Sequence, residues 1–116
     1  MKFKDAGEAL KTFKEAAIIH GECTENGNYK LGNKNYKKIA AARNYLKEIG
    51  ERELLRQFLN DSNLSVRGWA ATYLLPLCEN EALMVLNDIA STKGVYGGDA
   101  STTIQEWRKG NLKSLY

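Results

Sequence analysis

Along most of this chain, hydrophobic residues recur at steps of three and four positions, with polar residues between them. This is the period of an amphipathic α-helix, whereas a half-buried β-strand would alternate apolar and polar positions. In residues 3–20 the apolar positions are Phe3, Ala6, Leu10, Phe13 and Ala17. The spacing predicts a first helix, which Gly21 and the polar residues 24–28 are expected to end.

Residues 31–49 predict a second, longer helix, because their core-facing positions fall on one stripe about 100° wide. The stripe consists of Leu31, Asn35, Ile39, Ala42, Leu46 and Ile49. Gly50 stands where a left-handed helix C-cap is expected.

Four shorter helices are expected after Gly50. They cover residues 51–59, a segment that ends near Leu75, residues 82–89 and residues 99–107. Asn63 or Ser65 is expected to cap the second of these four, and Pro76 to end it. The last helix is expected to begin at Asp99, after a flexible glycine-rich loop at residues 94–98.

The predicted fold class is all-α, since no segment combines β-branched residues with strict alternation. A shift of 30 residues aligns Leu54, Leu55 and Leu59 with Met84, Val85 and Ile89, which is a weak internal repeat. Repeats of this length are typical of stacked helical hairpins. We therefore expect about three hairpins in a single domain, residues 1–116. Their continuous core is expected to consist of Leu31, Ile39, Leu46, Ile49, Leu55, Leu59, Ala70 and Leu74.

The segment 54–71 resembles a HEAT repeat. It reads LLRQFLNDSNLSVRGWAA, with leucines in a first helix, Asp61 in the turn, and Arg67 and paired alanines opening a second helix. More narrowly, residues 66–77 (VRGWAATYLLPL) are similar to a bacterial family of short HEAT-like proteins without an assigned function. The resemblance implies an α-α superhelix, a turn-stabilising ion pair of Asp61 with Arg67, and no catalytic residues.

The composition is that of a folded globular domain, since 43% of the 116 residues are hydrophobic and 27% are charged. No apolar run reaches the length of a signal peptide or a membrane span, so we expect no membrane association and a cytoplasmic location. Cys23 and Cys78 stand 55 residues apart without a CxxC motif, which argues against a disulfide framework or thiolate metal site. Both cysteines are expected to be small buried hydrophobic residues.

Few side chains of the sequence are suited to catalysis. His20 is the only histidine, so a Ser-His, Cys-His or His-rich metal arrangement would rest on one residue. The glycine-rich residues 94–99 match neither the GxGxxG nor the Walker pattern of phosphate binding. The sequence therefore predicts a protein that is not an enzyme and uses no metal or cofactor, with His20 as a hydrogen-bonded residue near a helix end.

Basic residues are concentrated in the first half of the chain. Residues 1–50 contain ten basic and six acidic residues, a net charge of +4, and residues 51–116 contain seven and eight, a net charge of −1. On one face of the predicted second helix, opposite its apolar stripe, lie Lys30, Lys34, Lys37 and Lys38. This face predicts contact with phosphates or an acidic protein, although a solvated lysine face without a partner is the simpler interpretation.

Trp69 and Tyr73 stand one helical turn apart and are placed to form one aromatic patch. The sequence leaves open whether Trp69 is a core residue or an exposed anchor of the kind that dominates protein interfaces. Trp107 is instead expected in the core beside Ile104. Together with the lysine face, the aromatic patch favours a non-enzymatic protein-interaction module. One version of this function is an immunity-type inhibitor that occludes the active site of a bacterial toxin. The alternative is binding of nucleic acid or another acidic partner through the basic second helix.

Overall fold

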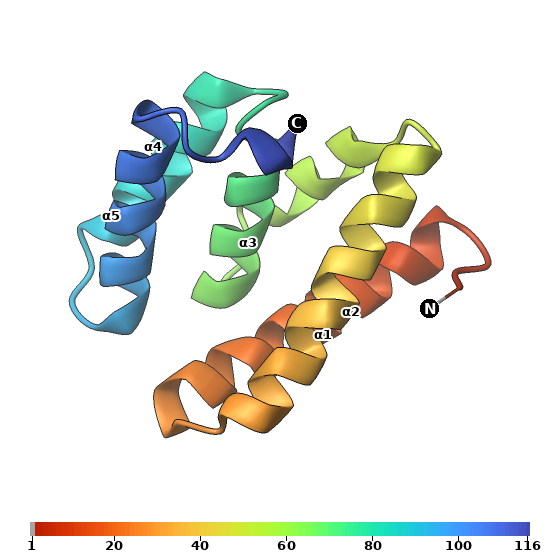
Figure 1. Cartoon of the computed structure of the whole chain (residues 1–116), viewed down its shortest axis with the longest axis horizontal. Helices are drawn as coiled ribbons and strands as arrows, with labels where there is room; N and C mark the ends of the chain where they lie inside the picture. The colour runs from red at the N-terminus through yellow and green to blue at the C-terminus, as the bar shows by residue number, and fades with distance from the viewer. Residues whose placement is uncertain (1) are drawn as a thin grey trace. The chain divides into compact units, whose positions relative to one another are not determined.

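The computed structural model describes residues 2–116. Its elements are α1 (Ala6–Asn26), α2 (Tyr29–Glu48), η1 (Arg52–Phe58), α3 (Leu64–Leu74), α4 (Glu79–Ala90), α5 (Val95–Arg108) and η2 (Lys113–Leu115). All are helices, and no strand occurs in the described residues, so the predicted all-α class is confirmed (Figure 1). The chain divides into two compact units, the first ending at Leu55 and the second spanning Arg56–Tyr116.

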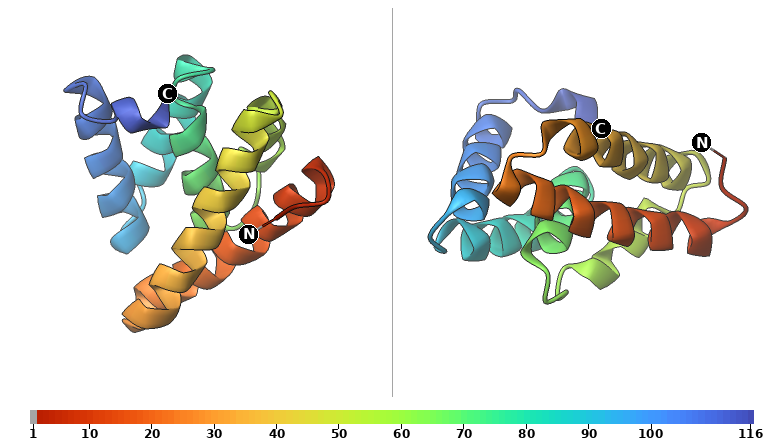
Figure 2. Two further views of the ribbon diagram at one scale, coloured as in Figure 1. Left: turned by 45° about the vertical axis from the view of Figure 1, so that its right-hand side comes forward. Right: turned by 90° about the horizontal axis from the view of Figure 1, so that it is seen from below.

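The first unit is an antiparallel hairpin in which α1 and α2 lie side by side (Figures 1 and 2). Gly27 ends α1 with a left-handed φ of 76°, and its N–H donates to the carbonyl of Cys23. Asn28 then starts α2, because its side-chain oxygen accepts the Leu31 N–H at 3.3 Å. A glycine stop and an asparagine cap thus form a two-residue turn that sends the chain back along α1.

Small and large side chains alternate in the core of this hairpin. The hydrophobic residues of α1 and α2 at 0–2% exposure are Ala9, Phe13, Ala16, Ala17, Ile39, Ala42 and Leu46. The alanines let the two helices approach closely, since the interaxial distance depends on the side chains at the contact. Each buried Phe, Ile or Leu side chain contributes about 1.5–3 kcal/mol of transfer free energy.

Two residues of the predicted core are exposed instead. Leu31 is 41% and Ile49 43% exposed. At 100° per residue, both lie about 70° from the centre of the buried arc of α2. That arc comprises Gly32, Asn35, Ile39, Ala42, Arg43 and Leu46. The other six residues of the predicted core, from Ile39 to Leu74, are buried.

Gly21 does not end the first helix, contrary to the prediction. It is buried within α1, which continues to Asn26. A glycine inside a helix costs only about 1 kcal/mol relative to alanine, so packing against a neighbouring element can outweigh that cost. His20 consequently lies inside the helix, where it is half-buried and its carbonyl accepts the Thr24 hydroxyl at 3.0 Å.

The second unit packs α3 against the α4 and α5 pair (Figures 1 and 2). Asn63, not Ser65, caps α3 by accepting the Val66 N–H at 3.1 Å. The helix ends at Leu74, two residues before Pro76, as predicted. Its buried residues Val66, Ala70 and Leu74 form a core with Leu86, Ile89 and Ile104 of the other two helices.

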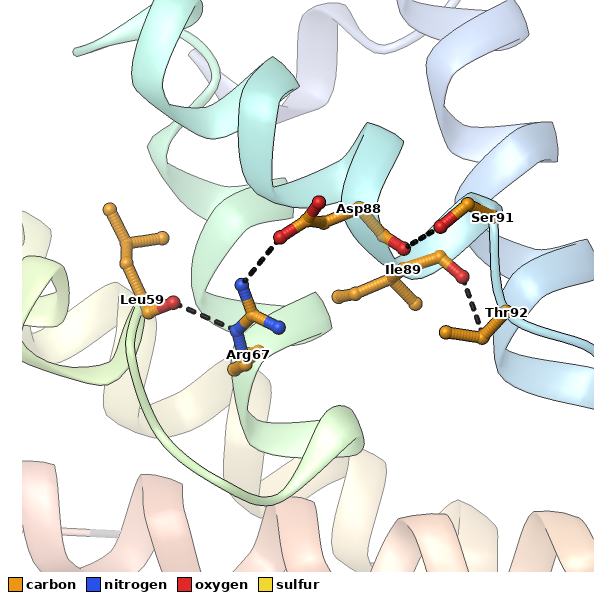
Figure 3. Close-up of polar contacts among 6 residues, drawn as sticks. All are labelled: Leu59, Arg67, Asp88, Ile89, Ser91 and Thr92. Carbon is orange, nitrogen blue, oxygen red and sulfur yellow. Dashed lines mark hydrogen bonds and ion pairs between the residues drawn. The ribbon is translucent and has the colours of Figure 1, made fainter.

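Arg67 connects three parts of this unit. Its Nε donates to the Leu59 carbonyl at 2.9 Å, and its guanidinium lies 3.6 Å from the Asp88 carboxylate (Figure 3). The arginine thus holds the turn after η1 against α3 and α4. The Asp61 carboxylate accepts the Asn63 N–H at 2.9 Å, and its pairing with Arg67 stays a prediction.

The last long helix begins earlier than expected. It starts at Val95, after Gly94 with φ 104°, so residues 95–98 are helical and Asp99 is not the cap. A Cβ at the buried Gly97 would lie 2.1 Å from the Thr92 carbonyl oxygen. The absence of a side chain therefore lets this end of α5 lie against the end of α4.

The helix predicted at residues 51–59 is a 3-10 helix, Arg52–Phe58, and the division between the two units falls within it. The i to i+3 bonds of a 3-10 helix are poorly aligned, so such helices are short.

Candidate interaction surface

The four predicted lysines lie together on α2. Lys30, Lys34 and Lys37 are exposed and Lys38 is half-buried. At 100° per residue they fall within an arc of about 100°, roughly opposite the buried positions of the helix. We call this arc the lysine face.

The charges of the lysine face destabilise the helix that carries them, α2. The first turn of α2 holds no acidic residue, although the positive end of the helix dipole favours acids there. Lys34 stands four residues from both Lys30 and Lys38, and each such like-charge pair costs about 0.2–0.5 kcal/mol. An anionic partner would remove this repulsion.

The same arc continues into the second half of α2, where the N-terminal segment lies on it. Phe3 packs against Tyr45 with ring centroids 5.4 Å apart and planes at 58°. A hollow of about 380 Å³ is lined by Lys2, Phe3, Ala41, Asn44, Tyr45 and Glu48. We call this feature the N-terminal hollow.

The N-terminal hollow does not follow from the sequence pattern, because Phe3 fits the helical period of residues 3–20 and is therefore expected in the first helix. One signal of it was present: Ala41 and Tyr45 stand at i and i+4 on the polar face of the second helix. An alanine and an aromatic residue follow the lysines on that face, where further polar residues would be usual.

The predicted aromatic pair exists on α3. The rings of Trp69 and Tyr73 are stacked, with centroids 5.7 Å apart and planes at 29°. Tyr73 is only 6% exposed, whereas Trp69 is half-buried. The accessible area of this pair therefore belongs mainly to Trp69. The pair lies in the second unit and the lysine face in the first.

Trp107 is half-buried rather than enclosed in the core. Its Nε1 donates to the Glu79 carboxylate at 2.6 Å, and its ring meets Tyr116 edge-on, with centroids 5.8 Å apart. The indole therefore joins α5 to the start of α4 and to the C-terminal residue.

Cys78 stands at the N-cap of α4 and is half-buried, whereas Cys23 is buried as predicted. Burial raises the pKa of the Cys78 thiol, the Glu81 carboxylate raises it further, and the Arg56 guanidinium lowers it. The raised pKa keeps the thiol protonated at neutral pH, so it is a poor nucleophile.

The described residues contain no group of three or more His, Cys, Asp or Glu side chains that could hold a metal ion. None of their helices combines the length and the apolar character that a membrane span requires. Comparison of the chain with protein-family models, with curated proteins and with solved structures gave no match.

Proposed function

We propose that this protein is a non-enzymatic binding module whose lysine face binds an acidic surface of a protein partner. The observation that supports this function is the grouping of four lysines on one side of α2, in a segment, residues 29–47, that contains no acid. Grouped charges of one sign steer an oppositely charged partner and set the register in which it binds.

An acidic protein fits this surface better than nucleic acid does. The sequence pI is about 8.8 and the net charge only +3, whereas nucleic-acid-binding domains are commonly more basic. Farther along the same arc stand Tyr45 and Glu48, and a carboxylate there would repel a continuing phosphate backbone. Nucleic-acid binding is the second candidate, supported by the lysines alone.

We further propose that the module is a HEAT-like helical repeat. A HEAT-like helical repeat would present the lysine face on a rigid scaffold, as such repeats present extended binding surfaces. An immunity-type inhibitor is one version, in which a small cytoplasmic helical protein covers the active site of a toxin. This version rests on the size of the chain and on the HEAT-like motif at residues 54–71, which is fold-level analogy.

The test is the triple variant Lys30→Glu, Lys34→Glu and Lys37→Glu. All three side chains are exposed, so each change should alter the free energy of unfolding by at most about 0.5 kcal/mol. At low salt, the parent protein should capture poly-glutamate, a surrogate for an acidic protein surface, and the triple variant should not. A control with the same change in net charge replaces the exposed Lys93, Lys109 and Lys113 by Glu and should retain capture.

A salt titration with duplex DNA separates the two candidates. If the lysine face tracks a phosphate backbone, the logarithm of the DNA affinity should fall with log salt at a slope of about −3 to −4, as four neutralised phosphates require. Tighter binding of DNA than of poly-glutamate, with that slope, would favour the nucleic-acid candidate. If the triple variant captured poly-glutamate as well as the parent protein does, the lysine face would be a solvated surface without a binding role.

A further inference from the structure

The N-terminal hollow and the lysine face form one continuous surface along α2. Ala41, which lines the hollow, stands four residues after Lys37 and three after Lys38, so it lies one helical turn from each. From Lys30 to Glu48 the surface extends about 27 Å, at 1.5 Å per residue. A ligand on the lysines would therefore reach the hollow without changing direction.

The hollow has the composition of an anchor site. Two half-buried aromatic rings, Phe3 and Tyr45, meet at one side of it, and Ala41 lines it with only a methyl group. Lys2, Asn44 and Glu48 add polar groups to the lining. Apolar walls with a few polar groups are typical of sites that take one bulky side chain.

The two ends of this surface carry charges of opposite sign. The lysines lie on the N-terminal side of the hollow, whereas Glu48 lines it at the last residue of α2. A ligand with carboxylates on the lysine side and none near Glu48 would match both ends. Lys34 stands seven residues before Ala41, about 10 Å along the helix, which an extended peptide spans in about three residues.

We infer that the N-terminal hollow anchors a bulky apolar side chain of an acidic peptide segment, whose carboxylates lie one to three residues away on the lysine face. The inference rests on the proposed function, because it assigns the lysines to the carboxylates of the same partner. It adds the second half of the recognition motif, an apolar residue that follows or precedes a short acidic run.

The experiment compares the binding of two labelled peptides to the chain of residues 1–116 by fluorescence anisotropy. One contains four consecutive acidic residues next to one phenylalanine, and the other has serine in place of that phenylalanine. Each peptide is synthesised in two versions, with the acidic run either before or after the phenylalanine or serine. The phenylalanine peptide should bind about tenfold more tightly than the serine peptide in at least one order, as expected for an anchoring aromatic side chain.

Ala41→Leu should abolish this preference by filling the hollow, leaving the affinity for the serine peptide unchanged. Ala40→Leu is the matched control, because Ala40 is half-buried but does not line the hollow. Phe3→Ser removes one wall without changing a helical residue, so it provides the same test if Ala41→Leu fails to fold.

The outcomes distinguish the inference from the proposed function. Equal affinity for the two peptides, unaffected by Ala41→Leu and by Phe3→Ser, would contradict the inference that the hollow anchors an apolar side chain. It would leave the proposed function of the lysine face unaffected. Failure of both peptides to bind at low salt would overturn the proposed function and the anchor together. Glu48→Lys should also strengthen binding of the peptide order that places an acid at that end.

Discussion

Arg67 shows how far the role of one residue depends on its surroundings. In the sequence it belongs to a turn motif, but in the structure it contacts the Leu59 carbonyl and the Asp88 carboxylate, the latter on α4. Near Asp88, the hydroxyls of Ser91 and Thr92 donate to the carbonyls of Asp88 and Ile89, both at 2.6 Å (Figure 3). These bonds satisfy carbonyls that the end of a helix leaves without partners.

The raised pKa of Cys78 makes a prediction about stability and pH. A thiol whose pKa is higher in the folded protein favours the protonated form there. Its contribution to stability is complete below its ordinary pKa of 9.0 and is lost as the pH rises through the raised value. The free energy of unfolding should therefore fall above pH 9 more steeply in the parent protein than in Cys78→Ser, as measured by urea denaturation.

The two charged neighbours of Cys78 predict opposite changes in its reactivity. Glu81→Gln removes a group that raises the thiol pKa, so alkylation at pH 8 should accelerate. Arg56→Gln removes the group that lowers it, so alkylation should slow. Peptide mass spectrometry distinguishes Cys78 from the buried Cys23. Acceleration in both variants would mean that loss of the Arg56 and Glu81 ion pair opens the site, and would contradict the electrostatic explanation.

At the scale of elements, the junction of α4 and α5 depends on one glycine. Gly97→Ala would place a Cβ 2.1 Å from the Thr92 carbonyl oxygen, so the backbone must shift. Overpacking of this kind costs about 1–3 kcal/mol. We expect a lower melting temperature for Gly97→Ala.

Gly98→Ala is the matched control for this prediction. Nothing lies within 4 Å of a Cβ at Gly98, and alanine is favoured over glycine inside a helix by about 0.8–1.0 kcal/mol. This variant should melt at a higher temperature than the parent. A stabilising Gly97→Ala would show that the two helices do not need the close approach.

At the scale of the whole molecule, charge and tryptophan are unevenly distributed. The net charge is +4 in residues 1–50 and −1 in residues 51–116, and both tryptophans, Trp69 and Trp107, follow residue 55. Tryptophan fluorescence therefore reports on the second unit, whereas far-UV circular dichroism reports on the helices of both.

This distribution allows a test of the prediction that residues 1–116 are a single domain. Leu46 in the first unit is 0% exposed and Leu86 in the second is 1% exposed, so Leu46→Ala and Leu86→Ala should each cost about 2–5 kcal/mol. If the chain unfolds cooperatively, as small domains commonly do, Leu46→Ala lowers the melting temperature measured by fluorescence and by circular dichroism equally. A fluorescence transition unchanged by Leu46→Ala, while Leu86→Ala lowers it, would show two independent folding units.

The sequence alone was sufficient for features that depend on residues within one or two helical turns. The helical period, the end of α3 before Pro76 and the left-handed Gly50, with φ 72°, were predicted correctly, and Asn63 was one of the two caps predicted for α3. The grouping of the four lysines on one side of α2 also followed from spacing. Such features are local, because side chains three and four positions apart meet on one face of a helix whatever the helix packs against.

The tertiary structure decided which part of each stripe is buried. Leu31 and Ile49 lie on an apolar stripe, but α1 covers an arc centred elsewhere, so both are exposed. From the sequence, Gly21 is expected to end a helix and Gly97 to lie in a loop, yet each lies inside a helix and is buried. The N-terminal hollow exists because Phe3 meets Tyr45, 42 positions later in the chain. Burial and contact depend on where a second element lies, and a periodic pattern within one element does not specify that position.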